Sequence, residues 1–362
     1  MFYIGLSCFI VQLLFKKKNF DFITSNFIIH RAFFVLIFVF TLCKVVNSGI
    51  EFLISEFLEQ IKIYLIFMWA YQFIYFSRFK FDYLRKALIL ALLVSVFYGC
   101  MQSVGLDLFY RMENGRLCGF QGNSYTYAGQ LIALLFFVIE IFFFEKHNSK
   151  RFLYFLLILL TIFCVLSSGQ RAVIASMYAS LILFLVVKYL KWKPFLRSDY
   201  FYLFWMFSIP IVLLKIVNSP TVIKRVRKVF YLHENSENIR LQLWELALTL
   251  WKKNIFFGSG FYPTVHHITP KKVQYLSHAH SIYFHTLAVS GLFGFFALVN
   301  LFVSFIYVGL INLSKNKFAL SSLCVIFAFL LEGIFEYNFG DSEVRNLLFF
   351  VLAVTYANFD NK

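Results

Sequence analysis

Long apolar segments recur along the whole chain and constrain its fold more than any other feature. A helix of about 20 apolar residues crosses the hydrocarbon core of a bilayer. Segments near or above this length lie at 1–15, 27–46, 51–76, 87–106, 124–144, 152–167, 172–190, 200–217, 281–311, 318–336 and 342–358. Backbone polar groups inside a bilayer must be hydrogen-bonded within the protein, so such segments fold as helices. The sequence predicts an all-α fold, a polytopic transmembrane bundle of about 11 spans that forms a single integral-membrane domain over 1–362.

The composition excludes the other broad classes of protein. The chain is 60% hydrophobic and only 14% charged, which leaves too little polar surface for a soluble domain of this length. Its net charge of +16 does not indicate nucleic acid, because the cations lie between apolar spans, where topology and anionic lipids account for them. The six cysteines are scattered without a CxxC motif, which excludes a disulfide framework and a zinc module. We therefore expect membrane lipids as partners, and no nucleic acid.

The connectors between the spans alternate in charge. Those after the odd-numbered spans carry 18 Lys and Arg, and the others carry 6 when the long connector and Lys215 beside it are set apart. Cytoplasmic connectors hold the excess of cations in membrane proteins. This alternation predicts a multi-pass topology with the N-terminus outside and the C-terminus in the cytoplasm.

The connector 218–280, between spans eight and nine, is expected to lie outside and to contain short amphipathic helices. Its first part, Thr221–Leu232, has the composition of a short basic helix, and Ser236 is a candidate N-cap for a second. The second helix is predicted over Ile239–Lys253, with four apolar residues on one face: Leu241, Trp244, Leu248 and Trp251. This face is expected to lie on the bilayer surface or on the mouth of the bundle.

A histidine cluster opens span nine, at the end of the long connector. His278 and His280 flank Ala279, and the sequence permits a metal site, a polar helix cap or a neutral imidazole that accepts a proton near neutral pH. No Cys, Asp or Glu within several residues completes a tetrahedral ligand set, so we expect neither a metal nor another cofactor. His280 and His278 are both candidates for the base.

Three arginines lie at the predicted outer edge of the membrane. Arg171 follows Ser168 and Gly169 in a very short connector, where it either snorkels to the interface or binds an anion at a helix N-terminus. Arg240 begins the loop helix, where a cation is unfavourable unless an anion is near, although a solvated position remains open. Arg116 precedes span five.

Three sequence patches carry a family resemblance. They are GRLCGFQGNSYTYAGQL (115–131), LSSGQRAVIAS (166–176), and a third that runs from Arg240 through WELALTLWKKNIFFGSGF to SHAHSIYFHTLAVSGLFG. Together with the final helix, the likeness spans 115–358, and the chain resembles the O-antigen ligase and polymerase-like superfamily. The chain departs from the family pattern in Ser-Gly-Gln-Arg-Ala at 168–172 and in Ser281, where the family has asparagine.

The resemblance implies a bacterial inner-membrane glycosyltransferase with a periplasmic active face. Such proteins transfer a glycan from an undecaprenyl-diphosphate donor to an acceptor sugar hydroxyl without a metal. Arg171 and Arg240, with Arg116 assisting, would stabilise the diphosphate leaving group. His280 would act as the base, with His278 as its rival.

The sequence is also compatible with other functions. The acceptor is a lipid A-core sugar for a ligase and a second lipid-linked glycan for a polymerase, and no sequence feature separates the two. A transporter or flippase would place charges near the bilayer midplane, whereas here they gather at one face. A non-enzymatic assembly protein is the third alternative.

Overall fold

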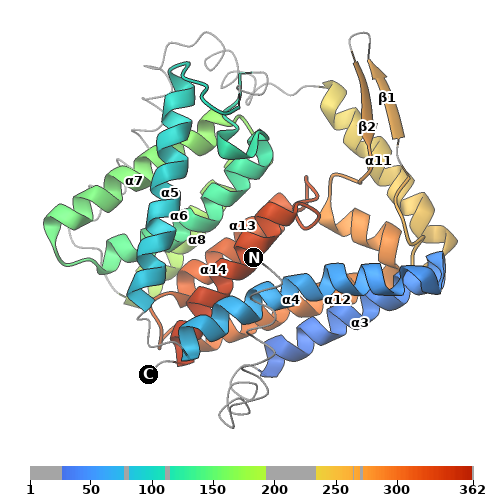
Figure 1. Cartoon of the computed structure of the whole chain (residues 1–362), viewed down its shortest axis with the longest axis horizontal. Helices are drawn as coiled ribbons and strands as arrows, with labels where there is room; N and C mark the ends of the chain where they lie inside the picture. The colour runs from blue at the N-terminus through green and yellow to red at the C-terminus, as the bar shows by residue number, and fades with distance from the viewer. Residues whose placement is uncertain are drawn as a thin grey trace.

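The computed structural model confirms an all-α membrane bundle and adds one small β-hairpin (Figure 1). It describes residues 27–76, 81–110, 115–192, 234–263, 265–269 and 272–360. The helices are α3 (Phe27–Ser48), α4 (Leu53–Phe76), α5 (Phe81–Ser103), α6 (Ser124–Phe144), α7 (Asn148–Ser167), α8 (Arg171–Trp192), α11 (Glu234–Lys253), α12 (Ile282–Asn312), α13 (Ala319–Glu332) and α14 (Ser342–Asp360). Two short 3₁₀ turns, η1 (Ile50–Phe52) and η2 (Gly119–Gln121), precede α4 and α6. The predicted spans 1–15 and 200–217 and the predicted helix Thr221–Leu232 lie outside the described residues.

Six of the described helices are long and apolar enough to cross a membrane: α3, α5, α6, α7, α8 and α12. Helix α13 is apolar but shorter. The count of about 11 spans therefore stays a prediction, while the helical and membrane-spanning character of the chain is confirmed.

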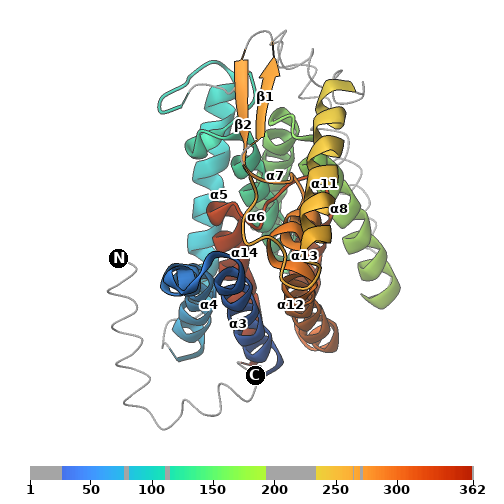
Figure 2. The same ribbon diagram turned by 90° about the vertical axis from the view of Figure 1, so that its right-hand side faces the viewer.

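Two packed groups of helices make up the bundle. One group contains α3, α4, α12 and α14, and the other contains α5, α6, α7 and α8, with α13 and α14 packed against both (Figures 1 and 2). Phe33 of the first group lies among Phe67, Phe305 and Phe349, each from a different helix. Such aromatic contacts contribute more stabilisation than their buried area alone, and they join the four helices α3, α4, α12 and α14.

The helix of the long connector, α11, packs along α12 rather than standing free (Figure 2). Its buried residues are Leu243 and Ala247, whereas Leu241 is 53% exposed. The buried face of α11 is therefore rotated by part of a helical turn from the predicted one. Trp244 of the predicted face does stack on Phe284 of α12, with 4.9 Å between the ring centroids. The predicted N-cap was also wrong, because the helix begins at Glu234 and Ser236 lies inside it.

A glycine-rich loop after α11 fits into a kink of α12. Gly291 has φ +62° and breaks the helical path. The amides that follow the kink, those of Leu292 and Phe293, donate to the carbonyls of Ile255 and Phe256 at 2.9 and 3.2 Å. A Cβ at Gly291 would collide with the backbone at Phe256, so the close approach requires glycine. The loop thus satisfies the helix backbone and fixes α11 on α12.

The rest of the long connector differs from the prediction. Residues after the glycine loop form an antiparallel hairpin of β1 (Val265–Thr269) and β2 (Lys272–Leu276), with Val265 opposite Leu276. From sequence alone, Pro263 and Pro270 indicate a loop in this stretch and no strands. The hairpin leads directly into the histidine segment at the start of α12.

Candidate functional site

The histidine segment is held against the turn between α13 and α14. The amide of Ile282 and the hydroxyl of Ser281 both approach the carbonyl of Gly333, at 2.8 and 3.3 Å. His280, directly before them, has φ +46°, a left-handed conformation that is uncommon for a residue with a side chain. Its amide donates to His278 Nδ1 at 3.3 Å. The backbone at this point is shaped to aim the His280 ring toward the turn.

Glu336 in that turn bridges two of the predicted site residues. Its Oε1 lies 2.5 Å from His280 Nδ1, and its Oε2 lies 3.8 Å from Arg240 Nη2. The three side chains are partly buried, with Glu336 15%, His280 23% and Arg240 33% exposed. His280 and Arg240, predicted separately from positions 40 residues apart, therefore meet at one carboxylate.

The charges around Glu336 decide its protonation state. Burial alone would raise its pKa, but the hydrogen bond and charge of His280, together with Arg240 and His278, bring the pKa below its usual value. Glu336 is thus ionised and accepts hydrogen bonds only. The hydrogen of this contact then lies on His280 Nδ1, so in the neutral ring the lone pair is on Nε2, where the ring can take up a proton from another molecule.

His278 lies beside His280 and differs from it in its surroundings. The two ring centroids are 4.2 Å apart. Burial lowers the pKa of His278, and the nearby His280 lowers it further, while Glu336 opposes both. His278 is therefore neutral at pH 7, and its Nδ1 is occupied by the amide of His280.

The structure also brings together a possible metal-ligand set that sequence spacing did not suggest. Among the described residues, the ligand atoms of His278, His280 and Glu336 lie within 4.8 Å of one another. The expectation of no metal was based on the absence of an acidic residue close to the histidines in the sequence. Glu336 lies 56 positions after His280 in the chain, so sequence spacing did not reveal it. Three protein ligands also occur in catalytic zinc sites, so the expectation of a metal-free site stays a prediction.

Arg116 and Arg171 lie at a second cluster of helix ends. Arg171 is the first residue of α8, and the Arg116 side chain runs alongside Gly169, whose Cβ, if it had one, would lie 3.7 Å from Arg116 Nε. The amide of Leu117 donates to the carbonyl of Ser167 at 3.4 Å. Arg116, from the segment before α6, therefore lies beside the short turn between α7 and α8 that leads to Arg171.

The first turn of α6 connects this region with the histidine site. Gln170 Nε2 donates to Ser124 Oγ at 2.8 Å, and Thr126 Oγ1 donates to Asp341 Oδ2 at 2.5 Å in the turn that carries Glu336. The buried Tyr125 lies within the electrostatic reach of Glu336. Asn123 caps this turn by accepting from the amide of Tyr125 at 2.8 Å. The predicted residues thus form two clusters joined through α6.

Sequence reasoning did not assign a role to Glu336, the carboxylate that organises the site. A second omission is Tyr337, whose ring lies 3.8 Å from that of His285 and 5.8 Å from that of His278. The run EYNFGD, unusually polar between two apolar helices, was the available signal.

Comparison with known proteins agrees with the sequence resemblance. A family model described as O-antigen ligase matches residues 155–299. The matched segment contains Arg171, Arg240, His278 and His280, and it ends before Glu336. No curated protein matches the chain. The predicted resemblance to the O-antigen ligase-like superfamily is thereby confirmed, and the match supports a glycan-transfer role of this general kind.

Proposed function

From the family match and the geometry around Glu336, we propose that the chain transfers an undecaprenyl-diphosphate-linked glycan to an acceptor sugar hydroxyl. We place the reaction on the periplasmic face of a bacterial inner membrane, as the positive-inside distribution favours. The contact of His280 with the ionised Glu336 carries the proposal, because it makes Nε2 a proton acceptor.

The transfer needs no reactant other than the donor and the acceptor. The acceptor oxygen attacks the anomeric carbon of the donor sugar and forms the new glycosidic bond, while the bond from that carbon to the diphosphate oxygen breaks. The hydroxyl proton passes to His280 Nε2, and undecaprenyl diphosphate leaves with the bonding electrons. Direct attack inverts the anomeric centre.

Arg171 and Arg116 are assigned to the leaving diphosphate. A guanidinium pairs with phosphate oxygens through two parallel hydrogen bonds, which stabilises the charge that develops as the bond breaks. Arg171 begins α8 and Arg116 lies beside Gly169 in the turn before it, and we assign both to the same anion. Arg240 touches Glu336 at 3.8 Å, and we assign it to holding that carboxylate ionised as well as to the anion.

The ligase and polymerase versions differ only in the acceptor. A gene deletion that removes all long glycan from the lipid A-core while lipid-linked polymer persists indicates a ligase. A single repeat on the core indicates a polymerase. Unchanged glycan in both fractions would contradict the proposed function.

Reconstitution tests the assigned roles. With a lipid-diphosphate oligosaccharide, His280→Ala is expected to abolish transfer and to keep donor binding, whereas Arg171→Ala is expected to weaken donor use. Arg151→Ala is a matched control, because Arg151 lies at the opposite end of α7 from the Arg116 turn region. Full activity of both site variants would refute the mechanism.

A further inference from the structure

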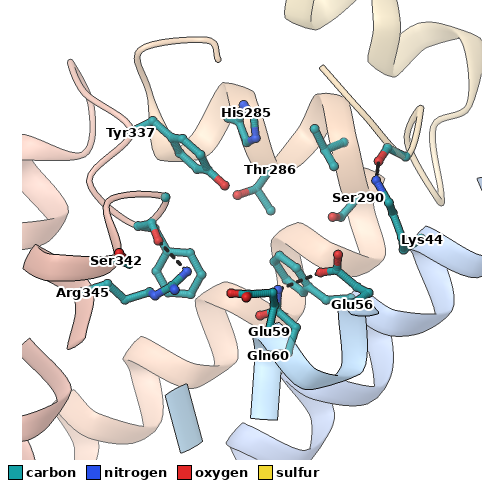
Figure 3. A pocket seen from close by; sticks show the side chains of 15 residues that line it. Lys44, Glu56, Glu59, Gln60, His285, Thr286, Ser290, Tyr337, Ser342 and Arg345 are labelled. Atoms are coloured by element: carbon teal, nitrogen blue, oxygen red, sulfur yellow. Dashed lines mark hydrogen bonds between the residues drawn. The ribbon is translucent and has the colours of Figure 1, made fainter. Parts of the chain in front are cut away.

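A cavity of about 340 Å³ lies beside the histidine site, among the ends of α3, α4, α12 and α14 (Figure 3). Its size falls in the range of small-molecule sites, about 300 to 1,000 Å³. Its walls are polar, although the four helices around it are mostly apolar. The polar residues that line it include Glu56, Gln60, His285, Thr286, Tyr337 and Arg345.

Three buried polar atoms in these walls have no hydrogen-bond partner among the residues that the structure describes. They are Arg345 Nε, Gln60 Oε1 and His285 Nδ1. Arg345 and Gln60 are each only 8% exposed. Buried polar groups without a partner are rare because they are costly, so these walls are unusually polar for a bundle of apolar helices.

The charges of the cavity oppose a diphosphate. The negative charges of Glu56 and Glu59 interact electrostatically with Arg345 from across the cavity. Among the described residues, neither carboxylate forms an ion pair with Arg345. Lys44, the other cation, donates to the carbonyl of Gly260 at 2.7 Å. The two cations and two carboxylates cancel in formal charge, which suits an uncharged ligand rather than an anion.

The shape and chemistry of the walls match a sugar ring. A sugar hydroxyl both donates and accepts hydrogen bonds, so it can serve a guanidinium on one side and a carboxylate on the other. Figure 3 shows the hydroxyl of Tyr337 and the side chain of Thr286 facing Glu56 and Glu59 across the open centre. The Tyr337 ring adds an amphipathic aromatic surface of the kind that accompanies polar ligands.

The cavity lies next to the histidine site, although His278, His280 and Glu336 do not line it. Tyr337 follows Glu336 directly in the chain, and its ring lies against those of His285 and His278. We propose that this cavity is the acceptor subsite and binds an uncharged sugar of the acceptor glycan, which presents its hydroxyl toward His280. This assignment rests on the proposed glycan transfer.

The binding test uses full-length protein in nanodiscs and a panel of methyl glycosides of neutral hexoses and N-acetylhexosamines. Saturation-transfer NMR is expected to detect binding of at least one glycoside to the wild type. Glu56→Gln replaces a charged acceptor by a neutral amide, and Thr286→Val removes a hydroxyl; each is expected to weaken that binding about tenfold. The matched control is Glu51→Gln, since Glu51 is exposed and lies outside the cavity; its binding should equal that of the wild type.

Three outcomes overturn the assignment: no glycoside binds the wild type, both cavity variants bind as the wild type does, or inorganic pyrophosphate displaces the glycoside. A monodisperse size-exclusion profile with normal donor binding verifies that each variant is folded.

Transfer assays separate this inference from the proposed function. Acceptor KM raised about tenfold in Glu56→Gln, with donor KM unchanged, supports the subsite. Transfer with unchanged acceptor KM in both variants refutes the subsite and leaves the proposed function standing. Specific glycoside binding in a wild type that transfers nothing refutes the proposed function and leaves the cavity as a sugar site.

Discussion

Replacing Glu336 with glutamine tests the central contact of the site. The substitution keeps the size of the side chain and its hydrogen bond to His280 but removes the negative charge 2.5 Å from Nδ1. When His280 accepts the acceptor proton, its ring becomes a cation that Glu336 stabilises in the wild type. We therefore expect Glu336→Gln to slow the transfer step itself rather than to weaken substrate binding.

The magnitude follows from the burial and the distance. A hydrogen bond to a charged group contributes about 1.5 to 3 kcal/mol. His280 and Glu336 are both less than a quarter exposed, so solvent screening removes little of this energy. The lost stabilisation predicts a kcat about 10- to 150-fold below that of the wild type.

Single-turnover transfer from a lipid-diphosphate oligosaccharide, with both substrates saturating, measures this effect. The matched control is Glu343→Gln, because Glu343 is an exposed carboxylate in the first turn of α14 outside the histidine site. We expect it to retain wild-type kcat. A kcat of Glu336→Gln within twofold of the wild type would show that His280 works without its carboxylate, and the mechanism would then be wrong.

Three further predictions concern metal dependence, pH and folding. Exhaustive chelation is expected to leave transfer unchanged, and loss of activity restored by a divalent ion would instead assign His278, His280 and Glu336 as metal ligands. The pKa of Glu336 in the folded protein lies below its value of about 4.5 in the unfolded chain. Its contribution to stability is therefore complete above pH 4.5 and is lost as the pH falls through the folded-state pKa. The melting temperature of the wild type should decrease in this acid range, and that of Glu336→Gln should not show this decrease. Gly291→Ala is expected to destabilise the fold by about 1–3 kcal/mol, from strain at φ +62° and collision with Phe256, and an unchanged melting temperature would contradict the role given to the kink.

The sequence predicted the spans well because their limits depend on local chemistry. The predicted span 124–144 coincides with α6, which begins after the capping Asn123 and ends where Glu145 and Lys146 restore polarity. Lipid and protein interior both demand apolar side chains, so hydropathy reports such helices regardless of what they pack against.

In the long connector, by contrast, the structure of each element depends on the segments that it packs against. The apolar residues of α11 allow more than one face, and contact with α12 selected the face with Leu243 and Ala247. The hairpin formed across a stretch in which prolines indicated only turns. For the site, the candidates His280 and Arg240 were recognisable, but their common partner Glu336 was not, because a contact across 56 residues is set by the packing of α12 against the turn that follows α13.

The turn between α13 and α14 explains why one local change would affect several functions together. It supplies Glu336 to His280 and Arg240, Tyr337 to the neighbouring cavity, and Asp341 to Thr126 of α6. Glu336 and Tyr337 are consecutive, so the turn cannot move one without the other. A sugar held against Tyr337 would therefore fix the carboxylate that orients His280, and acceptor binding would organise the base at the moment the acceptor needs it.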